Sequence, residues 1–294
     1  MKIGLIIDKF DPITSTILDQ VNQYRKKLHL DEVWFFVLDE NADCDLSYRN
    51  KMVEKTIVPY RKYYLADLND FNLIEKRIYK QLSLKQNKYY SNADLKGVEK
   101  IEIDFSSSKE VKKGNFNSLK NSIRSYIMDN GIYCEMILSS LLPEKRFRHS
   151  VSVARLSAKI AESNGLDSKL AYLIGMYHDI AKKVSKEEME KIINDNDAYE
   201  SSYSPPVWHQ YVGMYLLKHT YKWNSKVGLK AVRHHCLGDD KDPYSIIVYL
   251  ADKLDPLRDY DSSKEIELAC KDLNMAYKVV KSQQEEYLLK EGVI

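Results

Sequence analysis

The sequence contains only four cysteines among its 294 residues, and no two of them form a CxxC pair. They are scattered along the chain, at Cys44, Cys134, Cys236 and Cys270. A disulfide framework or a structural zinc site needs paired cysteines, so neither is expected. The pattern is typical of a protein in a reducing compartment, and we expect a cytoplasmic one.

Long apolar runs and a strong charge of one sign are absent too. The N-terminal stretch MKIGLIIDKF is interrupted by Asp8 and Lys9, which makes it too short for a signal peptide. No run approaches the roughly 20 apolar residues that cross a bilayer. The net charge is only +2, which gives no support to a protein that coats nucleic acid. We therefore expect neither a membrane partner nor a nucleic-acid partner.

The residues that are present favour a soluble globular protein with two domains. Hydrophobic residues make up 44% of the chain and charged residues 30%, and the length suits two ordinary domains. The pattern of predicted secondary structure changes near residues 129–133, where Asn130-Gly131 can end a helix. We therefore predict one domain at residues 1–132 and another at 133–294.

The first half alternates strand and helix patterns. Residues 2–8 (KIGLIID) predict a buried strand, followed by a helix over 16–28 and a second strand over 32–40. A strand, a helix and a strand at this spacing form a βαβ unit, which predicts a parallel sheet. A third strand is expected at residues 100–105, and a helix from about Asn117.

Helical periodicity takes over from about Ile137. Ser185 and Glu188 form a capping box, and Pro205-Pro206 stands where a helix start tolerates proline. The expected helices span residues 146–164, 168–182, 186–194, 206–221, 225–236, 244–254 and 263–290. The second half is therefore predicted to be an all-α bundle.

Six of the seven histidines lie in this helical half, between His149 and His235. An imidazole that faces a bundle interior needs a hydrogen-bond partner or a metal ion. Asp179 follows His178 at the end of an apolar run, and Asp252 interrupts the apolar run IIVYLAD. A carboxylate at such a position is unusual for a core and natural for a ligand.

The predicted ligands would project from facing helices: His149, His178, Asp179, His209, His235 and Asp252. Four imidazoles and two carboxylates are too many for one open catalytic ion. They suit two ions with a carboxylate between them. This mixture of ligands favours iron, manganese, cobalt or zinc over calcium or magnesium.

These stretches resemble the HD-domain metallophosphohydrolases, and within them the YqeK-type symmetrical diadenosine tetraphosphatases. The matching segments follow in the family's order: KRFRHSVSVA (145–154), YHDIAKK (177–183), WHQYVGMYLLK (208–218), RHHCLG (233–238) and ADKLDPLRDY (251–260). The resemblance assigns the same six residues as metal ligands. It favours His235 over the alternative, His234, because His235 keeps the family's spacing to Gly238. Family members carry threonines where this chain has Cys236-Leu237, which puts a hydroxyl contact to substrate in question.

The resemblance implies symmetrical hydrolysis of diadenosine tetraphosphate to two ADP by a metal-activated water, with two iron ions in the site. Asp179 would be catalytic by bridging the ions. Lys182 and Arg258 would be catalytic and bind substrate phosphate, and Arg146 would be a further substrate contact. The expected partner is therefore a small dinucleoside polyphosphate.

Three alternatives remain open at this point. One is an HD phosphohydrolase that acts on a mononucleotide or a cyclic dinucleotide. Another is a non-catalytic nucleotide-binding regulator. The third is a bifunctional enzyme that also makes NAD precursors.

The third alternative arises because the N-terminal half resembles nicotinate mononucleotide adenylyltransferases, through KIGLIIDKFDPIT and SSKEVKKG. The family's first motif has glycines and two histidines, which contact nucleotide phosphates. Here these positions hold other residues, at Ile7, Asp8, Thr14, Thr16 and Ile17. Losing the histidines removes the positive charge that stabilises phosphoryl transfer. We therefore expect a degenerate, Rossmann-like α/β nucleotidyltransferase domain.

The second motif of that family is partly kept. Ser107 and Ser108 remain, and its arginine has become Lys112. These three residues could still bind an anion. We expect the half to serve as a scaffold or a dimer surface, so a homodimer is one expected assembly.

Overall fold

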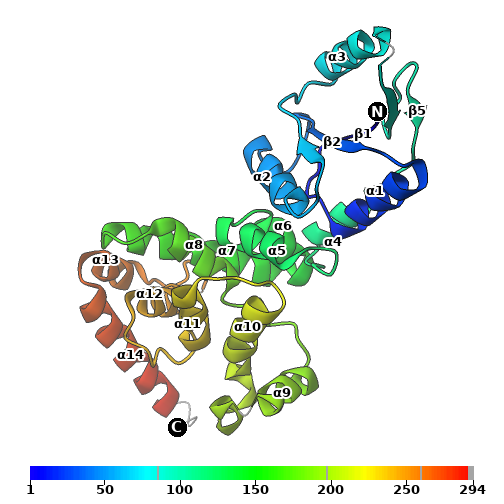
Figure 1. Ribbon diagram of the computed structural model, residues 1–294. Helices are drawn as coiled ribbons and strands as arrows, with labels where there is room; N and C mark the ends of the chain where they lie inside the picture. Colours follow the sequence, from blue (N-terminus) through cyan, green and yellow to red (C-terminus); the bar gives the residue numbers. More distant parts are fainter. Residues whose placement is uncertain (85, 197, 259, 291–294) are drawn as a thin grey trace. The chain divides into compact units, whose positions relative to one another are not determined.

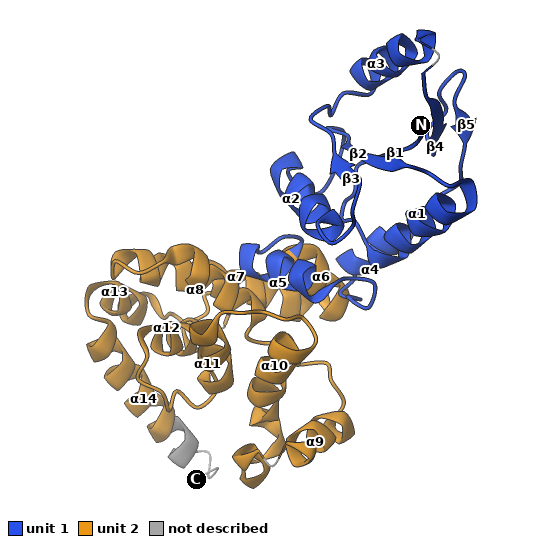
Figure 2. Ribbon diagram, in the orientation of Figure 1, with its two compact units in different colours: residues 1–133 blue, residues 134–294 orange. Residues whose placement is uncertain are grey.

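The computed structural model describes residues 1–84, 86–196, 198–258 and 260–290 (Figure 1). The chain divides into two compact units, unit 1 at Met1–Tyr133 and unit 2 at Cys134–Ile294 (Figure 2). Residues 291–294, which end the predicted second domain, lie outside the described residues. Asn130-Gly131 does end a helix, because Gly131 caps it with a φ of 69°.

Unit 1 contains a five-stranded parallel sheet with the order β3-β2-β1-β4-β5, whose strands are labelled in Figure 2. The strands are β1 (Lys2–Asp8), β2 (Glu32–Val37), β3 (Tyr63–Leu65), β4 (Lys88–Ser91) and β5 (Glu99–Lys100). The middle of β1 is buried throughout, which explains its unbroken apolar run, since strands of a parallel sheet are covered on both faces. The predicted parallel βαβ unit is confirmed.

The helices of unit 1 include one that was predicted closely. The predicted helix over 16–28 is α1, where the Thr14 hydroxyl accepts a hydrogen bond from the Ile17 N–H and caps the first turn. The unit's helices are α1 (Ser15–Leu28), α2 (Leu46–Ile57), α3 (Phe71–Ser83), α4 (Ser107–Lys112) and α5 (Asn121–Asn130).

The strand predicted at residues 100–105 is wrong. Only Glu99–Lys100 pair with β4, and the chain then leaves the sheet. Asp104 accepts hydrogen bonds from the backbone N–H and the hydroxyl of Ser106, which forms a turn just before α4. This local side-chain bonding outcompetes the strand pattern of the apolar residues.

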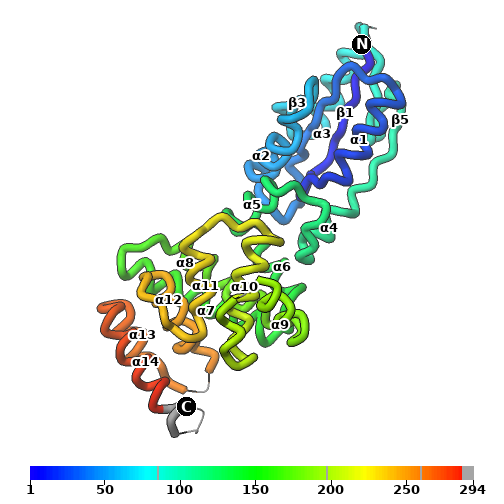
Figure 3. Tube along the Cα trace, turned by 60° about the horizontal axis from the view of Figure 1, so that its bottom comes forward, coloured from blue at the N-terminus to red at the C-terminus, as the bar shows by residue number. Residues whose placement is uncertain are grey.

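Unit 2 is helical in the described part of the chain (Figure 3). Its helices are α6 (Cys134–Leu141), α7 (Glu144–Ser163), α8 (Ser168–Tyr177), α9 (Lys186–Asp195), α10 (Trp208–His219), α11 (Lys226–His234), α12 (Pro243–Lys253), α13 (Ser263–Lys271) and α14 (Leu273–Lys290), with 3₁₀ turns at Tyr199–Ser202 and Pro205–Val207. The predicted helical bundle is confirmed. None of the described helices has the length and apolar character that a membrane span requires.

Two predicted helices end or break early. The helix predicted over 168–182 stops at Tyr177, and the chain continues as turns from His178. The helix predicted over 263–290 is two helices, because Asp272 adopts an extended conformation between them. α13 and α14 then lie side by side (Figure 3).

The packing of α7 against α8 positions the centre of unit 2. The two backbones approach closely at Gly175, where a Cβ atom would lie 2.5 Å from the Cα atom of Ala154. Glycine is therefore required for this approach. As a result His149 on α7 faces His178 at the end of α8, with ring centroids 5.3 Å apart.

Candidate metal centre

The structure brings all six predicted ligands together inside unit 2. His178 and Asp179 follow α8, while His149 and Asp252 belong to α7 and α12. The other two are His209 on α10 and His235, which follows α11. Five of the six are buried, and the His149 side chain is 13% exposed.

All four imidazoles are oriented in the same way. Each donates its Nδ1–H to an oxygen atom, and in three cases this is the carbonyl of the residue three positions earlier. The acceptors are the carbonyl oxygens of Gly175 for His178 (2.6 Å), Pro206 for His209 (2.9 Å) and Val232 for His235 (2.7 Å), and Asp255 Oδ2 for His149 (2.6 Å). A histidine held in this way presents its Nε2 lone pair, which is the usual arrangement of a metal-binding imidazole.

The two oxygens of Asp179 face different imidazoles. Oδ1 lies 3.1 Å from Nε2 of His209 and 3.7 Å from Nε2 of His235. Oδ2 lies 3.8 Å from Nε2 of His178. A carboxylate placed in this way can bind one ion through each oxygen.

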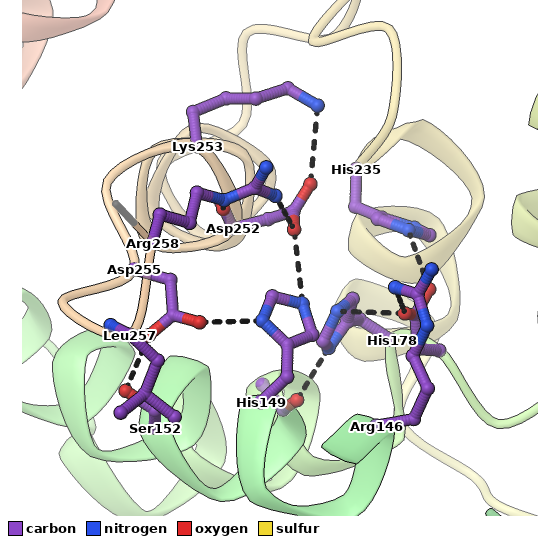
Figure 4. Close-up of polar contacts among 12 residues, drawn as sticks. Arg146, His149, Ser152, His178, His235, Asp252, Lys253, Asp255, Leu257 and Arg258 are labelled. Atoms are coloured by element: carbon purple, nitrogen blue, oxygen red, sulfur yellow. Dashed lines mark hydrogen bonds and ion pairs between the residues drawn. The ribbon is translucent and has the colours of Figure 1, made fainter. Parts of the chain in front are cut away.

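On the other side of the cluster, Asp252 Oδ1 lies 3.2 Å from Nε2 of His149 (Figure 4). Figure 4 also shows His149 lying between Asp252 and Asp255, with one carboxylate at each ring nitrogen. One carboxylate therefore orients the imidazole, and the other lies where it could share a cation with it.

The donor atoms fit two cations. They fall into two groups, His149–His178–Asp179 and His209–His235–Cys236, and within each group the ligand atoms lie within 4.8 Å of one another. His178 is fully buried, and its Nε2 atom has no hydrogen-bond partner among the described residues. Such an atom in a native core calls for a ligand, and mixed imidazole and carboxylate donors are typical of transition-metal sites.

The protonation states of the two carboxylates and of His178 suit cation binding. Burial alone would raise the pKa of Asp179, but the imidazoles of His178 and His209 hold that pKa well below its usual value. Burial would likewise raise the pKa of Asp252, but Lys253 and His149 keep it low. Burial lowers the pKa of His178 to about 4. At pH 7 both carboxylates are therefore ionised and His178 is neutral, which are the forms that bind metals.

Burial would lower the pKa values of His149 and His235, but Asp252 raises the first to about 9 and Cys236 with Asp179 raises the second to about 10. A cation therefore binds these rings by displacing a proton.

The three predicted phosphate-binding cations lie at the rim of the cluster. Arg146 Nη1 is 3.4 Å from Asp179 Oδ2, and Arg258 Nη2 is 3.0 Å from Asp252 Oδ1 (Figure 4). Lys182 Nζ donates to Nε2 of His209 at 3.0 Å. Both arginines also line a cavity of about 920 Å³, together with Lys145, Arg148 and His149. A basic cavity that opens beside the ligand cluster suits a phosphate-bearing molecule.

Sequence reasoning missed three side chains of the centre. Asp255 accepts hydrogen bonds from His149 and, at 2.5 Å, from the Ser152 hydroxyl. Lys253 lies 3.2 Å from Asp252. Cys236 was noted only as a departure at a substrate contact, but it lies within the second ligand group. The carboxylates of LADKLDP, three residues apart, were a usable signal for Asp255.

His234 and His235 were alternatives, and the structure separates them. His235 is buried and faces Asp179. His234 donates instead to Asp239 Oδ1 at 2.7 Å. His235 therefore belongs to the cluster and His234 does not.

In unit 1, the side chains that were predicted to bind an anion make hydrogen bonds and ion pairs with other residues of the unit. Ser107 Oγ lies 2.7 Å from Thr14 Oγ1. Ser108 donates to the Pro12 carbonyl at 2.7 Å. Lys112 makes ion pairs with Asp11, at 2.5 Å, and with Asp43. These side chains therefore already have partners at the end of β1.

The crevice beyond the ends of β1 and β4 is closed in a similar way. In an open parallel sheet with this strand order, ligands bind at this point. Here the Asn92 amide bridges to β1, since it accepts from the Ile7 N–H and donates to the Ile7 carbonyl, both at 2.8 Å. A phosphate would have to displace this side chain to reach the backbone of β1.

The fold and the cluster define a helical HD-domain protein. The model of the HD domain family matches residues 146–257, a range that contains all six predicted ligands. A crystal structure from Clostridium acetobutylicum, titled as a "predicted HD superfamily hydrolase involved in NAD metabolism", has a similar fold. Its TM-score is 0.50 at 23% identity, covering 54% of this chain and 87% of that one.

A named relative narrows this class of protein further. The symmetrical bis(5'-nucleosyl)-tetraphosphatase of Bacillus subtilis is 34% identical over 139 residues, which cover 46% of this chain and 75% of that protein. The chain therefore belongs to the symmetrical bis(5'-nucleosyl)-tetraphosphatase family of HD-domain proteins.

Two longer relatives extend the likeness into unit 1. Proteins of Mycoplasma pneumoniae and Mycoplasma genitalium, both named probable nicotinate-nucleotide adenylyltransferase/Ap4A hydrolase, are 34% and 29% identical. The matches cover 61% and 72% of this chain, and 54% and 62% of the relatives. The match that covers 72% of this chain includes more residues than unit 2 contains, so the likeness reaches beyond the HD domain. This chain spans between about half and two thirds of the length of these two relatives.

Proposed function

We propose that the chain hydrolyses diadenosine tetraphosphate symmetrically, to two molecules of ADP, at the cluster in unit 2. One observation carries this proposal: two groups of metal-ligand atoms adjoin at Asp179, beside a cavity lined with basic side chains. Family membership supports the choice of substrate, because the Bacillus subtilis relative is named for this activity.

In this proposal His149, His178, Asp179 and Asp252 would hold one ion, and Asp179, His209 and His235 the other. When bound, the ions would supply Lewis-acid activation of the attacking water and neutralise charge on the phosphates. Iron is the proposed metal, with manganese, cobalt or zinc as the other metals that this donor set accepts.

The chain's own cations would bind and orient the polyphosphate. Arg146 and Arg258 each offer a planar fork that binds phosphate oxygens in pairs. Lys182 would neutralise the charge that develops on the departing ADP. One P–O bond of the oxygen bridge between the second and third phosphorus atoms breaks. The water oxygen bonds to the phosphorus that loses the bridge, and the bridging oxygen leaves with the other ADP, so each product keeps two phosphates.

The cavity beside the cluster adjoins a second cavity. The cavity of about 920 Å³ adjoins another of about 580 Å³, and both are lined by Arg148 and Leu257. A long substrate could therefore continue from one cavity into the next. Arg148, Arg155 and Lys159 supply the basic lining of the smaller one.

For unit 1 we propose a degenerate nucleotidyltransferase domain that acts as a scaffold or as a homodimer surface. The internal bonds of Ser107, Ser108 and Lys112 support this role. ATP with nicotinate mononucleotide should therefore yield no pyrophosphate, and its release would overturn this part. A cytoplasmic location is also proposed, since all four cysteines are free thiols.

The proposal is tested by comparing substrates on the metal-loaded protein and on Asp179→Asn. We expect diadenosine tetraphosphate to turn over faster than mononucleotides or cyclic dinucleotides, and the variant to lose at least about a thousandfold in kcat/KM, because both ions lose a shared ligand. Circular dichroism controls for folding. Preference for another nucleotide would reject the substrate, and full activity in the variant would reject the site.

A further inference from the structure

Cys236 places a sulfur atom against the second ligand group. Its Sγ lies 3.2 Å from Nε2 of His209 and 3.3 Å from Nε2 of His235. The backbone fixes this position, because the Cys236 N–H donates to the buried side chain of Gln210 at 3.2 Å. The sulfur therefore lies where the two imidazoles converge.

These spacings match those between ligands of one ion. Bonds of about 2.3 Å to sulfur and about 2.0 Å to nitrogen, at a tetrahedral angle, separate the two atoms by about 3.5 Å. Asp179 Oδ1 completes the group, at 3.1 Å from Nε2 of His209 and 3.7 Å from Nε2 of His235. Four donor atoms from three different parts of unit 2 thus surround one point.

Two imidazole nitrogens face the Cys236 sulfur. The Nδ1–H groups of His209 and His235 donate to backbone carbonyls, so a neutral ring of either residue presents a lone pair toward the sulfur. The thiol proton can serve one of the two nitrogens, and Lys182 Nζ also lies 3.0 Å from Nε2 of His209. A cation would satisfy both nitrogens, the sulfur and Asp179 together.

A buried nitrogen without a hydrogen-bond partner among the described residues lies next to this group. His178 is fully buried, and its ring centroid lies 5.0 Å from that of His235. Its Nε2 atom has no hydrogen-bond partner within the described ranges of the chain. The unsatisfied nitrogen and the sulfur group therefore adjoin the same buried space.

We propose that Cys236 is a thiolate ligand of the ion held by His209, His235 and Asp179. This inference rests on the metal centre of the proposed function and adds a sulfur donor to it. Binding transfers the thiol proton to solvent as the metal–sulfur bond forms. A sulfur donor favours cobalt, zinc and ferrous iron over manganese at this position.

The test is a titration of the metal-free full-length chain with Co²⁺, followed by absorption spectroscopy without substrate. We expect a thiolate-to-cobalt charge-transfer band in the near ultraviolet. In Cys236→Ser this band should disappear while the visible cobalt bands remain, and affinity for the ion should fall about tenfold or more. Cys270→Ser, which removes a thiol outside the cluster, is the matched control and should keep the band.

Alkylation of the wild-type chain gives a second readout that needs no variant. Cobalt should protect Cys236 from iodoacetamide, as mapped by mass spectrometry, and leave labelling of Cys270 unchanged. Visible cobalt bands without the charge-transfer band, a band that survives in Cys236→Ser, or unprotected Cys236 would each overturn the inference and leave the two-ion centre standing. Absence of all cobalt bands would overturn both.

Discussion

At the scale of single residues, Asp255 shows how the centre is held in shape. Its carboxylate accepts the Nδ1–H of one predicted ligand, His149, at 2.6 Å, and it is held in turn by Ser152. The charge of Asp255 makes the imidazole a better donor at its other nitrogen. Asp255 is therefore a positioning residue of the proposed site.

Asp255→Asn should weaken metal binding while the fold is kept. The amide oxygen can still accept the hydrogen bond, but the negative charge is lost, and such changes typically reduce metal affinity about 10- to 100-fold. Competition with a coloured chelator measures this affinity. Ser152→Ala, which leaves the carboxylate on His149, should change it much less, and equal effects of the two variants would contradict the assignment.

The candidate site was largely predictable at this scale. His149, His178 and Asp252 stand out because polar residues in apolar helical runs need partners. Asp255 and Cys236 did not stand out, because an aspartate before a proline and a single cysteine are common in ordinary loops and helix ends. Only the fold shows that they face the same imidazoles.

At the scale of elements, the contact between α7 and α8 decides the geometry of the centre. Gly175 permits that contact, and its carbonyl also accepts the Nδ1–H of His178. A side chain at this position would push the two helices apart. The HD pair therefore depends on a glycine one turn before it.

Gly175→Ala should destabilise unit 2 by about 1–3 kcal/mol despite the better helix propensity of alanine, because the new Cβ would meet the backbone of Ala154 at 2.5 Å. Gly213→Ala is the control, since a Cβ there meets nothing closer than Val232, at 3.5 Å. Thermal unfolding should show a lower Tm for the first variant only. A similar Tm for both would mean that the helices are not held this closely.

In unit 1, α4 is tied to the loop after β1 by charge. Burial would raise the pKa of Asp11, but Lys112 and Tyr133 hold it below its usual value. A carboxyl group whose pKa is lower in the folded state stabilises that state above the unfolded pKa of about 3.8, and this stabilisation is lost as the pH falls toward the folded pKa.

Asp11→Asn should therefore destabilise unit 1 by about 1–3 kcal/mol at pH 7, and the difference from wild type should shrink as the pH falls below about 3.8. Hydrogen exchange of peptides from residues 1–133, compared between the two proteins at each pH, measures this. A difference that stays constant with pH would show that the charge of Asp11 contributes nothing.

The elements themselves were predictable where they are long and strongly patterned. β1, α1 and β2 follow from their apolar periodicity. β3 and β4 have three and four residues, too few for a pattern to be recognised. The break at Asp272 could not be predicted either, because no glycine or proline marks it in the sequence.

At the scale of the whole molecule, the chain combines a unit built on a parallel sheet with a helical unit that carries the candidate centre. The likeness to the two Mycoplasma proteins reaches into both units, and their names join two activities. Unit 2 has the buried ligand cluster and the basic cavity. In unit 1, the side chains predicted to contact phosphate are bonded to other residues of that unit. We therefore assign the proposed chemistry to unit 2 alone.

The most direct test of this account is product analysis by anion-exchange chromatography. The purified chain, loaded with ferrous iron or manganese, is given diadenosine tetraphosphate. The account predicts ADP as the only nucleotide product, because the centre directs water to one of the two middle phosphorus atoms. ATP with AMP in equal amounts would show that an outer P–O–P bridge is broken and would contradict symmetrical cleavage.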